Sequence, residues 1–219
     1  MPVAVNVCLP LPRAWADEAR RLNAALPLQP NPVPLAGGRA MPHITLVMGT
    51  LSEGALAALP ARLQQALAPE WPTLLAPVDT YLRREPGGID ASGVLIERSS
   101  SLQRLHERCM AVLAGLGLEP PVLEAIDADG EPVNPATLTL LGNFALRGSY
   151  GAYFPHITLG IGALAEGDFF AEGPAELRHV AVYTLGNLCS CRQELFRLEL
   201  GNMRPGQAVP QQVRPLVAE

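Results

Sequence analysis

The sequence lacks several features that define common functional classes. None of its apolar stretches is long enough to span a bilayer. Residues 1–12 hold no basic segment ahead of a long apolar run, so we expect no secretory signal. Only 17% of the 219 residues are charged, and no long run of like charges occurs. We therefore expect a protein that does not act in a membrane and that resides in the cytoplasm.

Clustered basic residues are also missing. The formal net charge is −5, with 16 Lys and Arg against 21 Asp and Glu. A surface that follows the phosphates of a long nucleic acid needs a concentration of basic side chains. This composition argues against DNA and against RNA of transfer-RNA size. It still allows a small anionic ligand, because such a ligand needs only a few local donors.

Cysteine is scarce and shows no disulfide spacing. The four cysteines are Cys8, Cys109, Cys189 and Cys191. Cys189 and Cys191 form a lone C-x-C, which is a weak metal signal without a second pair of ligands. We expect reduced cysteines, no metal and no other cofactor.

The composition favours an ordered α/β protein rich in turns. Hydrophobic residues make up 48% of the chain, and its 22 prolines and 20 glycines separate apolar segments. We expect one bilobal domain over 1–201, present as a monomer, followed by a loosely ordered tail over 202–219. The predicted strands are 3–9, 42–49, 73–82, 94–97, 137–141, 143–146, 155–162, 180–185 and 194–200, with turns at Gly87-Gly88 and Gly186-Asn187. The predicted helices are 13–26, 52–68 (which Pro60 can split), 99–116 and a short one at Phe169–Phe170.

One short motif occurs twice in the chain. Residues 42–49 read Pro-His-Ile-Thr-Leu-Val-Met-Gly, and residues 155–162 read Pro-His-Ile-Thr-Leu-Gly-Ile-Gly. Each copy is apolar and β-branched and ends in glycine, which predicts a β-strand. Two copies in a chain of this length indicate an internal duplication and two lobes, not a solenoid.

Alternation along each strand separates two faces. We expect an aliphatic face to be buried and a His–Thr face to line one cavity. The buried residues are Ile44, Leu46, Ile157 and Leu159, and the cavity residues are His43, Thr45, His156 and Thr158.

Two facing histidines permit acid–base catalysis, because one neutral imidazole can take a proton while one imidazolium gives a proton. A threonine hydroxyl two residues further on can bind a phosphate oxygen. The pattern needs no metal, since His-x-Thr lacks the additional imidazole or carboxylate that zinc sites contain.

The doubled His-x-Thr, together with the opening strand that ends in Leu-Pro-Leu-Pro, resembles the 2H phosphoesterase superfamily, which includes the 2′-5′ RNA ligases and cyclic nucleotide phosphodiesterases. The resemblance implies an α/β fold of the α+β type, with antiparallel sheets lining a central cleft and helices outside. It implies hydrolysis of a 2′,3′-cyclic phosphate or a 2′-5′ phosphodiester in a small nucleotide or RNA end. It assigns acid–base roles to His43 and His156, and phosphate binding to Thr45 and Thr158.

Other residues offer weaker signals. Arg39 can approach a phosphate or remain solvated. Tyr153 and Phe154 can stack on a base, although packing is the more common role of such residues. His106 and His179 have no motif partner and are interpreted as surface or boundary residues, and Arg83-Arg84 as a solvated pair.

Two alternative functions remain open. The protein can be a non-catalytic module that binds a nucleotide, or an enzyme of the ligase type that processes RNA ends. The motif does not tell which histidine is the base.

Overall fold

The computed structural model describes residues 1–85, 88–168 and 170–201. The predicted tail 202–219, Gly87 and Phe169 therefore lie outside the described residues. The strands are β1 Val3–Pro10, β2 His43–Leu51, β3 Thr73–Leu75, β4 Pro77–Glu85, β5 Ile89–Ile96, β6 His156–Ile161, β7 Ala175–Leu177, β8 His179–Leu185 and β9 Cys191–Glu199. The helices are α1 Arg13–Ala25, α2 Glu53–Leu67, α3 Ser100–Leu116 and α4 Pro135–Arg147, with short 3-10 turns at Leu123–Ala125, Tyr150–Ala152 and Asn187–Cys189.

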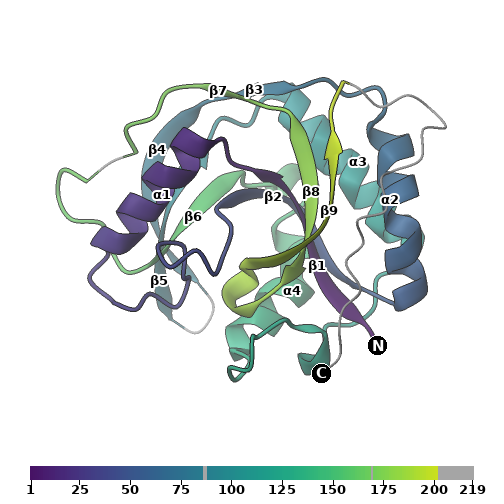
Figure 1. The fold of residues 1–219 in the computed structure, drawn as a ribbon, viewed down its shortest axis with the longest axis horizontal. Coiled ribbons are helices and arrows are strands. Elements are labelled where there is room, and N and C mark those ends of the chain that lie inside the picture. Colours follow the sequence, from purple (N-terminus) through teal and green to yellow (C-terminus); the bar gives the residue numbers. More distant parts are fainter. Residues whose placement is uncertain (86–87, 169, 202–219) are drawn as a thin grey trace.

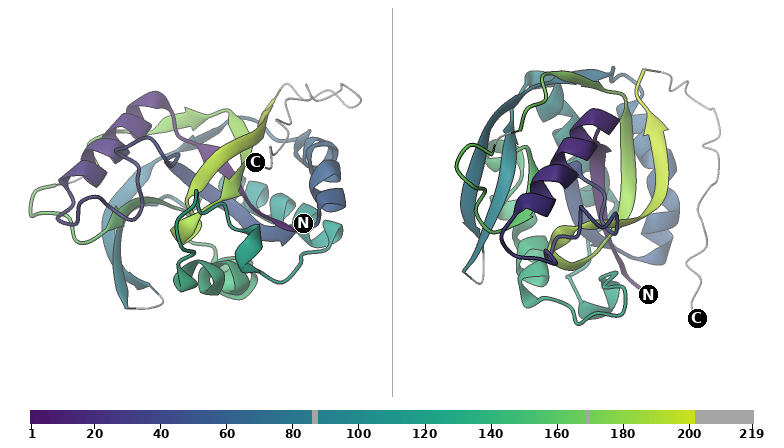
Figure 2. Two further views of the ribbon diagram at one scale, coloured as in Figure 1. Left: turned by 60° about the horizontal axis from the view of Figure 1, so that its bottom comes forward. Right: turned by 60° about the vertical axis from the view of Figure 1, so that its left-hand side comes forward.

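A seven-stranded antiparallel sheet forms the centre of the molecule (Figure 1), in the order β4-β5-β6-β2-β1-β8-β9. β3 and β7 form a separate two-stranded sheet, which lies at the opposite end of the molecule from α4 in both Figure 1 and Figure 2. This confirms the predicted class, with the sheets of the two halves joined into one.

The large sheet has internal pseudo-twofold symmetry about the β2–β6 pair. Moving outward, β6-β5-β4 on one side corresponds to β2-β1-β8 on the other. A bulge interrupts the ladder beside each threonine, between Val7 and Cys8 on β1 and between Ser92 and Gly93 on β5. In each half, helices connect the neighbouring strand to the histidine strand. α1 lies between β1 and β2, and α3 and α4 lie between β5 and β6. The duplication seen in the motif therefore extends to the strands beside it.

Helices α1, α2 and α3 cover the aliphatic side of the sheet. Leu46 and Leu159 are fully buried, together with Leu63 of α2, Leu105 of α3 and Leu22 of α1. In Figure 1, α1 lies on the left of the sheet, and α2 and α3 lie on the right. This arrangement leaves the opposite side of the central strands to the polar residues of the motif.

Capping residues fix the ends of α2 and α3 as predicted. The Ser52 and Ser99 side chains accept hydrogen bonds from Ala55 N and Leu102 N. Gly117 ends α3 with a φ of 80°, which disfavours any residue with a Cβ. Pro60 lies inside α2 without splitting it.

The predicted hairpin over 137–146 is wrong, because this segment forms α4. The Asn134 side chain caps the helix by accepting a hydrogen bond from Ala136 N, and Pro135 follows at the first helical position. Asn134-Pro135 is therefore a helix start and not an isolated turn. Phe170 is not helical, and it packs edge-on against Trp15 with ring centroids 5.8 Å apart.

None of the helices in the described residues is long and apolar enough to cross a membrane.

Candidate functional site

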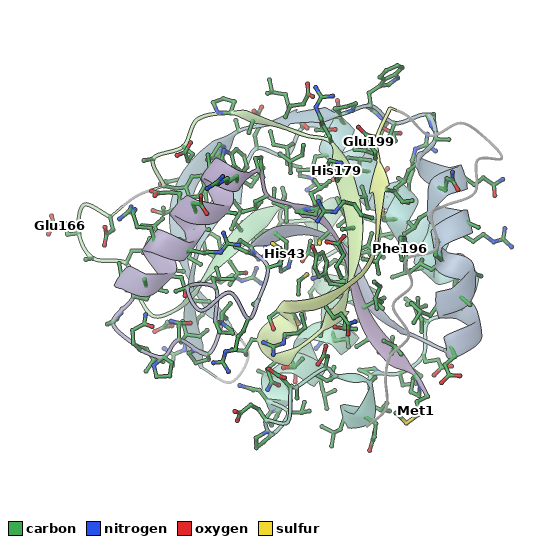
Figure 3. The ribbon with its side chains drawn as sticks, viewed as in Figure 1. Met1, His43, Glu166, His179, Phe196 and Glu199 are labelled. Atoms are coloured by element: carbon green, nitrogen blue, oxygen red, sulfur yellow. The ribbon has the colours of Figure 1, made fainter. Side chains whose placement is uncertain are left out.

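The two motif strands meet at a single point, where Ile44 pairs with Ile157. Extending this antiparallel register by one residue in each direction places His43 opposite Thr158 and Thr45 opposite His156. Ile44 and Ile157 are fully buried, so the four polar residues share the other face of the sheet. The structure thus confirms the predicted faces and brings both His–Thr pairs together. Figure 3 shows His43 near the middle of the molecule.

Both imidazoles are anchored in the same way. Nδ1 of His43 lies 2.7 Å from the Met41 carbonyl oxygen, and Nδ1 of His156 lies 2.7 Å from the Phe154 carbonyl oxygen. A carbonyl oxygen only accepts, so each Nδ1 carries a hydrogen. In each neutral ring, Nε2 is therefore the atom that can accept a proton.

Asn6 of β1 contacts both residues of the first pair. Its Nδ2 lies 3.2 Å from His43 Nε2 and donates to Thr45 Oγ1 at 3.0 Å. Asn6 is completely buried, and its Oδ1 has no hydrogen-bond partner among the described residues. Tyr153 donates from its hydroxyl to the Thr45 carbonyl oxygen at 2.9 Å. The first His–Thr pair is therefore held by side chains as well as by its strand.

The second pair has an aromatic neighbourhood instead. Within the described chain, no hydrogen bond is made to Nε2 of His156 or to Oγ1 of Thr158. The Tyr81 ring meets the His156 ring edge-on at 5.7 Å between centroids, and it meets the Phe154 ring in the same way at 5.3 Å. The Arg83 guanidinium lies 5.6 Å from the centre of the Phe154 ring. Tyr81, Phe154 and Arg83 are together called the aromatic wall below.

A glycine creates the space for this wall. Gly93 of β5 pairs with Thr158 on one side and with Tyr81 of β4 on the other. A Cβ at Gly93 would lie 2.5 Å from atoms of the Tyr81 ring, which is closer than van der Waals contact allows. The absence of a side chain at this position lets Tyr81 lie across β5 toward His156.

Burial favours neutral imidazoles in both pairs. Desolvation is the main cause that lowers the pKa of His43, the hydrogen bond to Met41 opposes it and the nearby His156 adds to it, and together they bring this pKa to about 4. Desolvation also lowers the pKa of His156. The hydrogen bond to Phe154 opposes this effect, and the charge of Arg83 adds to it. An anion bound between the rings would oppose these effects and favour the imidazolium form.

Two residues have structural roles here. Tyr153 is only 4% exposed, and its ring stacks on His106 with centroids 3.9 Å apart, so the packing interpretation is the one observed. The expectation that His106 is a surface or boundary residue is wrong, because it is fully buried. Its Nδ1 contacts the Leu46 carbonyl oxygen at 2.6 Å, and its Nε2 accepts from Tyr150 N at 2.8 Å. Both ring nitrogens are thus used to join α3 to β2 and to the turn before β6.

Arg39 does not join the four motif residues. It is exposed at the rim of a cavity of about 350 Å³, whose lining includes Arg192 and Asp129 but none of the His–Thr residues. His179 begins β8, consistent with a boundary position, and Figure 3 shows it near Glu199 and away from His43. Arg84 forms an ion pair with Asp90 at 3.9 Å.

Asn6, Tyr81 and Gly93 also lie at the site, although the repeated motif does not mark them. Asn6 is the one strongly polar side chain in the first strand, between Val5 and Val7, and that is the only signal that could have marked it. No local signal marks Tyr81 or Gly93, because their roles depend on the pairing of β4, β5 and β6. Within the described residues, no group of three or more His, Cys, Asp or Glu side chains is placed to hold a metal ion.

Comparison with solved structures identifies the fold. TT0787 of Thermus thermophilus aligns with a TM-score of 0.61 at 17% identity, over 90% of this chain and 98% of its own. E. coli LigT complexed with 3′-AMP aligns with a TM-score of 0.59 at 15% identity, over 92% and 99%. LigT complexed with NADP⁺ gives 0.58 at 14% identity, over 91% and 99%. No family model matches the sequence, and no curated protein matches it.

These alignments extend over nearly the whole of each neighbour, so the likeness includes both halves of the sheet and not one motif alone. The chain therefore has the fold of E. coli LigT and of TT0787, with two His–Thr pairs facing each other at the strand pair where its halves meet.

Proposed function

We propose that the protein is a metal-independent phosphoesterase of the 2H superfamily that hydrolyses a 2′,3′-cyclic phosphate or a 2′-5′ phosphodiester in a small nucleotide or an RNA end. One observation carries the proposal. The Ile44–Ile157 register puts two histidines and two threonines on one face, each histidine opposite the threonine of the other strand. Acid–base hydrolysis of a phosphate ester requires such an arrangement, with one proton-transfer group on each side of the phosphorus atom.

The reaction follows from the anchored rings. One neutral imidazole accepts a proton at Nε2 from the attacking water, and the other, as imidazolium, donates a proton from Nε2 to the leaving ribose oxygen. The water oxygen forms a bond to phosphorus, and the bond to the leaving oxygen breaks. Thr45 and Thr158 donate to the non-bridging oxygens, where negative charge increases in the transition state. The product is a phosphate monoester with a free hydroxyl.

A nucleotide substrate is supported by two further facts. Tyr81, Phe154 and Arg83 give one side of the site aromatic surface and positive charge, which suit a base and a phosphate. E. coli LigT, which shares the fold, has been crystallised with 3′-AMP, with ATP and with NADP⁺.

The test is product analysis over a panel of 2′,3′-cyclic nucleotides, 2′-5′ linked dinucleotides and RNA ends carrying a cyclic phosphate. We expect at least one class to be hydrolysed by the wild-type protein, and the His43→Ala/His156→Ala double variant to be inactive. Binding of a cyclic nucleotide without any product would support the non-catalytic module instead. Joining of RNA ends, with salt-sensitive binding of structured RNA, would support a ligase-type enzyme.

A further inference from the structure

We propose that Cys8 and Cys191 form a reversible modification site, at which a peroxide oxidises the two thiols to a disulfide and thereby lowers the activity of the adjacent His43–Thr45 pair. The proposed hydrolysis uses neither thiol, so only the effect on activity rests on the proposed function. Cys191 belongs to the C-x-C that the sequence presents without a second pair of ligands. The fold supplies a partner for it from the first strand, 183 residues away in the chain.

The two sulfurs lie close together in the reduced protein. All four cysteines are free thiols, and Cys191 Sγ donates to Cys8 Sγ at 3.8 Å. A disulfide needs its sulfurs about 2.05 Å apart, so they must move about 1.8 Å closer. Cys8 is held inside β1 between β2 and β8, whereas Cys191 is the first residue of β9 and follows the turn at Asn187–Cys189. The chain around Cys191 can therefore supply most of the movement.

The surroundings favour this pairing of the four cysteines over the others. Cys8 and Cys191 are both fully buried, and their apolar cluster is completed by Ala181, Tyr183 and Met41. Cys109 lies in the helix-covered core, and Cys189 packs in a separate cluster at the α4 end of the sheet. A thiol that is oxidised at Cys8 or Cys191 therefore meets the other one first.

A small oxidant can approach Cys191 from the cavity of about 350 Å³ at whose rim Arg39 lies. Ser190 and Arg192, on either side of Cys191 in the chain, both line this cavity. Burial nevertheless raises the pKa of the Cys191 thiol well above its usual range, and the thiolate is the form that reacts with a peroxide. We therefore expect hydrogen peroxide to act over minutes to hours.

The peroxide alone balances the reaction. The Cys191 thiolate attacks one peroxide oxygen, the O–O bond breaks, and hydroxide leaves a sulfenic acid behind. The Cys8 sulfur then attacks the Cys191 sulfur, the S–S bond forms, the S–O bond breaks, and water leaves. The two thiols lose two electrons, and the peroxide with the two thiol protons becomes two waters. A dithiol such as dithiothreitol reverses the step by thiol–disulfide exchange.

The new bond would act on the candidate site through backbone contacts. Cys8 pairs with Thr45 in the β1–β2 ladder. Met41 N donates to the Cys191 carbonyl oxygen at 2.9 Å, and the Met41 carbonyl oxygen lies 2.7 Å from His43 Nδ1. Movement of Cys191 toward Cys8 is thus transmitted to the atom that orients the His43 imidazole. A displacement of about 1 Å can cost about 100-fold in rate, so we expect kcat/KM to fall by about 10- to 100-fold.

The first test is peptide mapping of the full-length protein after treatment with hydrogen peroxide, with remaining thiols alkylated under denaturing conditions and without reductant. We expect the peptide that contains Cys8 to be linked to the peptide that contains Cys191, with two hydrogens fewer than the separate peptides. Dithiothreitol should separate them. Both thiols found alkylated, in protein whose half-buried Cys189 is fully oxidised, would overturn the proposal.

Three variants assign the link. It should be absent in Cys8→Ala and retained in Cys109→Ala, which is a matched loss of one fully buried thiol. It should also be retained in Cys189→Ser, because Cys189 packs in a different cluster. A link that disappears in Cys189→Ser would belong to that thiol and would overturn the assignment to Cys191.

The second test compares turnover of the best cyclic nucleotide before and after peroxide. The wild type should lose about 10- to 100-fold and recover with dithiothreitol, whereas Cys8→Ala should lose little. Recovery distinguishes the disulfide from methionine sulfoxide at Met41, which needs a dedicated reductase. Full activity of the linked wild type would overturn the coupling to the site. Absence of turnover in the reduced wild type would refute the proposed function, whereas the mapped link would still support the modification site.

Discussion

The half of the site around His43 and the half around His156 have the same backbone plan but different side chains. Beside the bulge next to Thr45 lies Cys8, followed by Ala181 on the next strand. At the equivalent places beside Thr158 lie Gly93 and Tyr81. The first half is closed by buried residues, and the second carries a half-buried aromatic ring.

Under the proposed function, the features that the halves share serve catalysis, and the features that differ serve recognition of the substrate. Both halves contain a strand that presents His and Thr on one face and a carbonyl oxygen that anchors each Nδ1. The neighbouring strands differ, because β1 adds a hydrogen-bonded support with Asn6 and β4 adds an aromatic surface with Tyr81. An asymmetric substrate, with a nucleoside on one side of its phosphate only, suits such a site.

Removing either imidazole should have the largest effect. General acid–base catalysis contributes about 10² to 10⁴ in rate, so we expect His43→Ala and His156→Ala each to lose that factor in turnover of the best cyclic nucleotide. The double variant should lose little more, because the two rings act in one step. Steady-state kinetics of the three variants checks this. Fully multiplicative losses would show that the two halves act independently.

Removing either hydroxyl should cost about 10² in kcat, which is typical for one donor to a developing negative charge. Thr45→Val and Thr158→Val should therefore look alike in turnover but differ in stability. Only Thr45→Val takes a partner from the buried Asn6 amide, at a cost of about 1 to 3 kcal/mol. Thermal unfolding of both variants measures the difference. Equal melting temperatures would contradict the supporting role of Asn6.

The features of this site that depend on residues close together in the chain could be predicted from the sequence. Alternation along the strand separates His43 and Thr45 from Ile44, and the serine caps set the starts of α2 and α3. Asn6 could not be predicted, because its contact with His43 requires β1 to lie beside β2 with a bulge between them. Strand order and bulges depend on long-range pairing, which no short pattern records.

The helix α4 shows a different kind of failure. Asn134-Pro135 is compatible both with a turn and with a helix start, and the threonines that follow favour strands in propensity. Tertiary packing decides the outcome. Leu141 of α4 is buried against Ala4 and Leu185. Thr137 lies one helical turn earlier and is also buried, so this face of α4 covers one end of the sheet. Propensity is a weak guide where an apolar face has a surface to cover.

Changes in the aromatic wall should have a smaller effect, mainly on KM. Stacking of a base on an aromatic ring contributes about 1 to 3 kcal/mol, so Tyr81→Ala or Phe154→Ala should raise KM by about 10-fold or more. Arg83→Ala should act in the same direction, and Arg84→Ala is its matched control, because Arg84 lies on the other face of β4 and pairs with Asp90. Equal KM values in Arg83→Ala and Arg84→Ala would show that Arg83 does not contribute to substrate binding in this half.

Chelation should have the smallest effect, which is none. The two halves together present two imidazoles and two hydroxyls, whereas a catalytic zinc site takes three protein ligands from His, Cys or carboxylate side chains. The proposed step also leaves a metal no task, because the imidazoles transfer both protons and the hydroxyls meet the phosphate charge. Turnover of a 2′,3′-cyclic nucleotide with and without EDTA, at equal ionic strength, tests this. Activity that EDTA abolishes and a divalent cation restores would refute the two-histidine mechanism. The strand register between β2 and β6 would be unaffected by that result.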